Sequence, residues 1–185
     1  MEAPDTLRQM RRLVVLNMLL LALALPAGAL ALQTNAGDGS LVVKNGSAPR
    51  GQAVVQLVVT GSSIGWVHGL GKIVIDDANA NNAAAPEITG ADGCKDLADS
   101  DPRQIYGNAR VCTGNDFRFR AVGDTFAITI YGSGVNLVAL GWGKAILAGI
   151  VGEPVDDGFY SLNGGDFRSL PGVPSKPLPF GTPNG

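Results

Sequence analysis

Residues 54–77 read VVQLVVTGSSIGWVHGLGKIVIDD and residues 125–149 read TFAITIYGSGVNLVALGWGKAILAG, and these two stretches decide the fold. With one residue inserted they align as two versions of one unit, matching at a Gly-Ser pair and at a Gly-x-Gly-Lys motif. Each version contains three short apolar or alternating runs separated by glycines, and glycine reaches the positive φ angles that tight turns need. The pattern predicts a three-stranded meander present twice.

Period-2 alternation predicts strands independently of the repeat. Phe117 and Phe119, and then Phe126, Ile128 and Ile130, fall on one face, while polar or small side chains alternate with them. Such alternation is typical of strands with one buried and one solvated face.

Shorter strands are predicted at both ends of the domain. Residues 40–44 are a candidate leading strand before an Asn-Gly turn, and residues 159–162 and 167–170 flank a second Asn-Gly pair as a candidate hairpin. The whole pattern predicts an all-β domain over residues 32–170, a small sandwich or barrel made of two pseudo-repeated three-stranded meanders and a C-terminal hairpin. Residues 171–185, which contain five prolines, are expected to be a flexible tail.

Residues 135–151 also permit another interpretation, a transmembrane helix, because they form a 17-residue stretch with one charge. The repeat argues against a helix, since the counterpart stretch from Ile64 to Asp77 contains His68 and ends in two aspartates. Lys144 would also lie in the middle of a bilayer. We expect strands buried on both faces instead.

The N-terminus follows the pattern of a secretory signal. Three arginines precede an apolar run at residues 13–25, and a stretch of small residues ends at Ala31. This order predicts a signal peptide over residues 1–31, cleaved after Ala31. An uncleaved anchor is the alternative, because residues 13–32 are about as long as a bilayer crossing needs. Cleavage would give a secreted or extracytoplasmic protein of the cell envelope with no membrane span.

The composition of the exported part excludes several classes of protein. After residue 31 the chain has 154 residues with 11 Lys and Arg against 14 Asp and Glu, a formal net charge of −3, and no basic run. This distribution gives no electrostatic footprint for nucleic acid, so no nucleic-acid partner is expected. Only two of these acids are Glu, and 25 of the chain's 26 Gly lie here, so a helical bundle is not expected either.

Cys94 and Cys112 are the only cysteines of the chain. In an oxidising compartment with no third thiol, a single disulfide is predicted. It would close a loop of about 18 residues and stabilise the fold by roughly 3 kcal/mol in the chain-entropy model. Two buried free thiols are the alternative. Because His68 is the only histidine, no zinc site is expected.

Oxygen-bearing side chains gather after the first repeat unit. Asp77, Asn79 and Asn81 occupy positions 1, 3 and 5 of a calcium-loop pattern, and Asp76 precedes them. The pattern fails at position 12, where Ile88 stands in place of a bidentate acid. Two interpretations therefore stay open, a calcium site and a solvated Asn-rich turn. No other cofactor is expected.

Catalytic chemistry has little support in the sequence. A secreted hydrolase using Asp carboxylates is the alternative function, and Asp76, Asp77, Asp156 and Asp157 all lie at predicted strand ends or turns, where Asp is common in any case. No spacing places a nucleophile beside His68. We therefore assign no catalytic residue and favour a non-enzymatic function over the hydrolase, which stays open.

Two apolar side chains are expected at loop tips. Leu70 and Trp142 stand at the centres of the Gly-x-Gly motifs of the two units. Exposed aromatic residues on loops are common on sugar- and partner-binding surfaces, but such side chains also cap the open end of a β-sandwich. Trp66, inside a predicted strand, is expected in the core. The long connection 78–104 resembles a strand only at residues 87–89.

The string FRFRAVGDTFAITIYGSGVNLVALGWGKAILAG at residues 117–149, followed by DGFYSLNGGDFRSLP, resembles an uncharacterised family of small secreted β-rich proteins of actinobacterial type. The markers of the resemblance are residues 118–120, 132–134 and 160–164. It implies a secreted β-rich protein without catalytic residues to carry over. We expect a secreted or cell-envelope module that binds a cell-wall, matrix or saccharide partner.

Overall fold

The computed structural model describes residues 37–79, 85–98, 101–102, 104–150 and 158–183. Every regular element within these residues is a β-strand, which confirms the all-β expectation. The predicted signal peptide and two of the candidate acids, Asp156 and Asp157, lie outside the described residues.

The strands are β1 (Gly39–Gly46), β2 (Val55–Asp77), β3 (Glu87–Thr89), β4 (Gly93–Asp96), β5 (Ala109–Tyr131), β6 (Val135–Leu147), β7 (Phe159–Leu162), β8 (Arg168–Ser169) and β9 (Leu178–Phe180). They form one continuous antiparallel sheet whose main path begins at β3 and ends at β8, so the sheet is not closed on itself. Of the stretch that was expected either as strands or as a membrane helix, residues 135–147 form strand β6.

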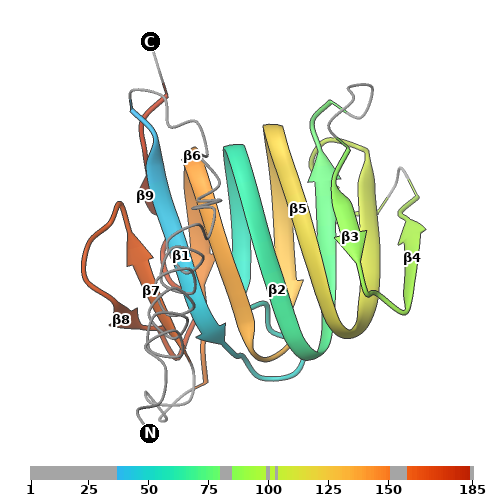
Figure 1. The fold of residues 1–185 in the computed structure, drawn as a ribbon, viewed down its shortest axis with the longest axis horizontal. Helices are drawn as coiled ribbons and strands as arrows, with labels where there is room; N and C mark the ends of the chain where they lie inside the picture. The colour runs from blue at the N-terminus through green and yellow to red at the C-terminus, as the bar shows by residue number, and fades with distance from the viewer. Residues whose placement is uncertain (1–36, 80–84, 99–100, 103, 151–157, 184–185) are drawn as a thin grey trace, which may run out of the picture. The chain divides into compact units, whose positions relative to one another are not determined.

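The sheet folds over into two layers because β2, β5 and β6 bend and continue from one layer into the other (Figure 1). The front layer of Figure 1 contains, in order, β3, residues 117–122 of β5, 62–67 of β2, 135–140 of β6, β1, β7 and β8. The back layer contains β4, residues 109–113 of β5, 72–77 of β2, 125–131 of β5, 55–60 of β2, 141–147 of β6 and β9. This arrangement is a sandwich.

Glycine makes one of these bends possible. Gly61 of β2 and Gly141 of β6 are paired with each other where both strands leave one layer for the other, and their φ angles are 137° and 125°. A Cβ atom on Gly61 would overlap the carbonyl oxygen of Leu140, and one on Gly141 would overlap that of Thr60. The two backbones approach this closely only because neither residue has a side chain.

The core lies between the two layers. Phe117 and Phe119 point inward from the front layer, and Phe126, Ile128 and Ile130 point inward from the back layer, so the face predicted from alternation is the buried one. The inward face changes from odd to even residue numbers where β5 bends between the layers. Both layers therefore contribute to a single apolar cluster.

The two segments 54–77 and 125–149 each run from the back layer to the front layer and back again. They differ from the expected separate meanders, because their strands pair across the two segments: residues 55–60 lie beside 125–130, and residue Ile64 lies beside Val138. Consecutive runs of one segment lie in opposite layers, so the two segments interleave. The sequence repeat itself stays a prediction.

The C-terminal hairpin forms as predicted, because Phe159 of β7 pairs with Ser169 of β8. Asn163 and Gly164, with φ angles of 51° and 71°, make its turn. The segment beyond it differs from the expected flexible tail. Residues 178–180 form β9 on the edge of β6, and Phe180 is fully buried in the core. Burial of one large aromatic ring fixes a segment whose prolines had suggested disorder.

The long connection between β2 and β5 is held at several points. β3 forms at the predicted residues 87–89. Cys94 of β4 lies directly opposite Cys112 of β5, and the two form the predicted disulfide. A cross-strand disulfide of this kind ties the edge strand β4 to the back layer.

Candidate ligand-binding groove

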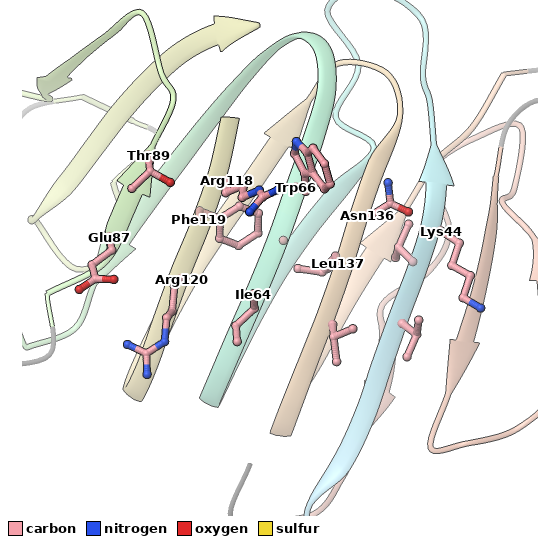
Figure 2. Close-up of a pocket in the computed structure, with 14 residues that line it drawn as sticks. Lys44, Ile64, Trp66, Glu87, Thr89, Arg118, Phe119, Arg120, Asn136 and Leu137 are labelled. Atoms are coloured by element: carbon pink, nitrogen blue, oxygen red, sulfur yellow. The ribbon is translucent and has the colours of Figure 1, made fainter. Parts of the chain in front are cut away.

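The outward face of the front layer carries an open groove with a volume of about 550 Å³. We call it the front groove. Five adjacent strands contribute to it, β3, β5, β2, β6 and β1 (Figure 2). The outward-facing side chains of the groove are those of Val42, Lys44, Ile64, Trp66, Glu87, Thr89, Arg118, Arg120, Asn136 and Val138.

Strand pairing orders these side chains in two rows across the strands. In one row Trp66 lies between Arg118 and Asn136. In the other row Ile64 lies between Arg120 and Val138. Side chains directly opposite on neighbouring antiparallel strands have Cβ atoms only about 5 Å apart, so each row presents a continuous surface.

Trp66 is part of this outer surface, so its predicted place in the core is wrong. Its neighbours Gly65 and Val67 face inward, and a Cβ atom on Gly65 would collide with the ring of Phe119. The inward space opposite Gly65 is therefore filled by a phenylalanine from β5. Alternation along the strand then places Trp66 outside.

Trp66 holds two neighbouring side chains in place. The guanidinium carbon of Arg118 lies 4.2 Å from the centroid of the indole ring, a cation–π contact. The ring of His68 lies 3.8 Å from the indole, centroid to centroid. The indole therefore works mainly as a support for Arg118, and the guanidinium is the group that faces the groove (Figure 2).

Positive charge dominates the groove. Lys44, Arg118 and Arg120 contribute three cations, and Glu87 contributes the one carboxylate among the described lining residues. Glu87 and Arg120 are directly opposite on β3 and β5, and no ion pair joins these two described side chains. The Nζ atom of Lys44 lies 4.3 Å from the centroid of the Phe167 ring, next to the edge of the groove.

Asn136 contributes more to the scaffold than to the groove. Its Oδ1 accepts a hydrogen bond of 3.1 Å from the backbone N–H of Asn45, and its Nδ2 donates one of 3.1 Å to the carbonyl of Gly134. These bonds hold the irregular end of β1, where the register with β6 shifts between Val43 and Gly46 and Asn45 has a φ angle of 52°. Thr89 and Glu87 also line the groove and can form hydrogen bonds with hydroxyl groups.

Two of the candidate calcium ligands point away from each other, and a calcium site stays a prediction. Asp76 and Asp77 are adjacent on β2, so their side chains point to opposite faces of the strand. Asp77 accepts a 2.9 Å hydrogen bond from the backbone N–H of Asn79, and its Oδ2 is buried without a hydrogen-bond partner. Asn81 lies outside the described residues. Within the described ranges no group of three or more His, Cys, Asp or Glu side chains could hold a metal ion.

Asp76 has structural partners of its own. Its carboxylate is buried and accepts hydrogen bonds from three backbone N–H groups in the loop before β5: Oδ2 accepts from Ile105 and from Tyr106, the latter at 2.6 Å, and Oδ1 accepts from Asn108 at 2.9 Å. Burial and the nearby Asp76 carboxylate raise the pKa of the Tyr106 hydroxyl above its ordinary value. Asp76 therefore anchors this loop to β2.

Leu70 and Trp142 are exposed, but they do not form one surface. Leu70 is 78% exposed beside the turn that leads β2 from the front layer to the back, whereas Trp142 is 36% exposed and pairs with Thr60 at the opposite bend of β2. Residues 62–67 separate the two bends, a length of about 20 Å at 3.3 Å per residue. Binding by either side chain stays a prediction.

His68 lies at the rim of the molecule beside the same turn as Leu70. Its Nδ1 is 3.6 Å from Oδ1 of Asp116, and both side chains are about half exposed. Asp116 Oδ1 also accepts a hydrogen bond from the backbone N–H of Gly69. The hydrogen bonds among the described residues join no serine side chain to His68, so a nucleophile–base pair is not formed here.

No family model, no curated protein and no solved structure matches the chain. In the part of the chain that the structure describes, no helix has the length and apolar character needed to cross a membrane. The disulfide and this finding are compatible with an extracellular protein.

Proposed function

We propose that the protein is an exported, non-enzymatic binding module whose ligand lies in the front groove. The predicted signal peptide and the Cys94–Cys112 disulfide support export, because disulfides persist in oxidising compartments. A cell-wall, matrix or saccharide component at the cell surface is the partner that this location makes accessible.

The observation that carries the proposal is the front groove itself. Ile64 and Val138 form an apolar floor, and Val138 is 40% exposed. Charged side chains stand around this floor at fixed positions on rigid strands. A concave apolar surface with a few placed polar groups is the usual form of a binding site. Strand-borne side chains also hold their geometry better than loop residues do.

Hydrolysis has weaker support than binding. Glycosidases use two carboxyl groups on either side of the scissile bond. Glu87 is the one carboxylate among the described residues of the groove, and the carboxylate of Asp76 is taken up by three backbone N–H groups. The described lining residues of the groove therefore favour binding of a ligand over cleavage of a bond in it.

Retention on insoluble polysaccharide tests the proposal. The purified chain is mixed with peptidoglycan, chitin or cellulose, and the bound fraction is measured after centrifugation, together with sugar release into the supernatant. We expect retention on peptidoglycan, which carries carboxylates, without sugar release, and we expect Trp66→Ala to lose it while Trp142→Ala keeps it. Thermal melting of both variants shows that each is folded.

Three results would contradict the proposal. Failure of the wild-type chain to bind any of these polymers, or the polyuronate described below, would remove the binding function. Release of soluble sugar would indicate a hydrolase. Loss of retention in Trp142→Ala but not in Trp66→Ala would move the site to the bend of β2 at Thr60, which pairs with Trp142.

A further inference from the structure

The front groove and the rest of the chain carry opposite charge. The chain has a formal net charge of −2, yet three cations and one carboxylate line the groove, which gives it a formal charge of +2. The cations are distant in sequence, since Lys44 comes from β1 and Arg118 and Arg120 come from β5. Folding gathers them on one face, and such a local field favours an anionic ligand.

The spacing of these cations requires a ligand with more than one anionic group. Lys44 on β1 and Arg118 on β5 are separated by β2 and β6, which are three inter-strand steps or about 14 Å at 4.8 Å per step. A fatty acid or another anion with a single charged head reaches only one side of the groove. A chain molecule with repeated anionic groups reaches both sides.

The two arginines favour carboxylate as the anionic group. A guanidinium donates two parallel hydrogen bonds to a carboxylate, and this geometry is selective as well as strong. Arg118 is held against the indole of Trp66 at 4.2 Å, so less conformational freedom is lost when a ligand binds. Arg120 lies one row further along the same strand and the same face.

The remaining surface favours a sugar chain over a peptide or a nucleic acid. Ile64 and Val138 offer an apolar floor for the C–H faces of sugar rings. The Glu87 carboxylate accepts hydrogen bonds, so it can bind the hydroxyl groups that stand beside the carboxylates of such a chain. Carboxylates for the arginines and hydroxyls for Glu87 occur together in sugar acids.

We infer that the front groove binds an acidic polysaccharide, a chain of sugars in which carboxylates recur. This inference depends on the proposed function and names the chemical class of its ligand. The sugar chain crosses the strands of the front layer, with carboxylates at Arg118 and Arg120 on one side and at Lys44 on the other (Figure 2).

The experiment compares one polymer in two forms. Polygalacturonic acid and the same polymer with its carboxyl groups reduced to alcohols are titrated with the purified chain by isothermal calorimetry, at low and at physiological salt. We expect binding to the acid form only, with weaker binding at higher salt because the groove charges are exposed to solvent. Arg120→Gln should weaken binding about tenfold, and the double substitution Arg118→Gln with Arg120→Gln about a hundredfold.

Arg50→Gln is the matched control, because Arg50 is exposed and does not line the groove. It removes the same charge and should leave binding within about twofold. Melting temperatures of the variants exclude unfolding as the cause of a loss, since surface substitutions of this kind change stability by only about 0.5 kcal/mol.

The outcomes separate this inference from the proposed function. Equal binding to both forms of the polymer, or retention on neutral polysaccharides alone, overturns acid recognition and leaves the binding module standing. Equal loss in Arg50→Gln and Arg120→Gln overturns the groove as the source of affinity. Binding of polyglutamate or single-stranded DNA as tightly as polygalacturonate overturns the choice of a sugar chain.

Discussion

Replacing Asp76 tests how the connection before β5 is held to the sandwich. The Asp76 side chain is buried, and its two oxygens accept hydrogen bonds from three backbone N–H groups, those of Ile105, Tyr106 and Asn108. Asp76→Asn keeps the shape of the side chain but replaces one acceptor oxygen with an NH₂ group that faces donors. Asp76→Ala removes both oxygens.

The expected loss can be worked from this geometry. A hydrogen bond to a charged group contributes about 1.5–3 kcal/mol. The loss for three such bonds is limited, because Ile105 and Asn108 are exposed residues whose N–H groups can turn to water once the loop detaches. We therefore expect Asp76→Ala to lower the free energy of unfolding by about 4 kcal/mol and Asp76→Asn by about 3 kcal/mol. Domains of this size have about 5–15 kcal/mol in total.

Urea unfolding followed by circular dichroism gives these free energies, and amide hydrogen exchange at Ile105, Tyr106 and Asn108 gives the local opening. Exchange at these three amides should become faster in both variants even below the unfolding transition. Asp92→Asn is the control, because Asp92 is exposed, and it should stay within about 0.5 kcal/mol of wild type. A loss below about 1 kcal/mol for Asp76→Ala would refute the anchoring role.

Two further predictions concern the bend and the tyrosine. Gly141→Ala should destabilise the fold by about 2–4 kcal/mol in urea unfolding, because its φ angle is 125° and a Cβ would overlap a carbonyl oxygen of β2. Gly123→Ala is the control: its φ angle is 89° but the space around it is open, so it should destabilise the fold by only about 1 kcal/mol. Equal losses in the two variants would contradict the close approach of the two strands at Gly141. Burial and Asp76 raise the pKa of the Tyr106 hydroxyl above its ordinary 10.0. As the pH rises, the unfolded chain therefore loses this proton before the folded chain does, and the free energy of unfolding declines once the pH exceeds the ordinary pKa. Urea midpoints from about pH 9 to pH 11 should therefore fall more steeply for wild type than for Tyr106→Phe, and parallel curves would contradict the raised pKa.

Local chemistry made much of the fold predictable. The Asn-Gly pair at Asn163 specified a turn that needs positive φ at both of its residues, and the hairpin formed there. The alternation from Phe117 to Ile130 identified the buried face of β5 correctly. Both patterns depend on only a few neighbouring residues, so they could be interpreted correctly without knowing which strands pair.

Strand pairing was beyond the reach of the sequence because it depends on long-range partners. Glycines at positions 61 and 141 suggested hairpin turns between neighbouring strands, but they are bends at which two long strands pass together into the other layer. The period-2 pattern is the same in either case. Phe180 was missed for a similar reason, since nothing near it in sequence forms the pocket of core that it fills.

The groove was missed because its residues are sequence-distant and because Trp66 was assigned to the wrong face. Large apolar side chains are usually buried, so Trp66 was expected to face inward. The packing is reversed. Ser63 is fully buried and Gly65 faces the Phe119 ring, because rings from β5 already fill the space inside that part of β2.

The core and the groove both follow from the alternation of inward-facing and outward-facing side chains along β5 and β2. On β5, burial of Phe117 and Phe119 leaves Arg118 and Arg120 no place except the outer face, one on each row of the groove. On β2, the glycine that admits the Phe119 ring puts the indole outside, beside Arg118. A shift of β5 by one residue would bury two guanidinium groups and expose the rings, at a cost far above the stability of a domain. The packing that makes the sandwich stable thus also fixes the positions of the two arginines that we expect to recognise the ligand.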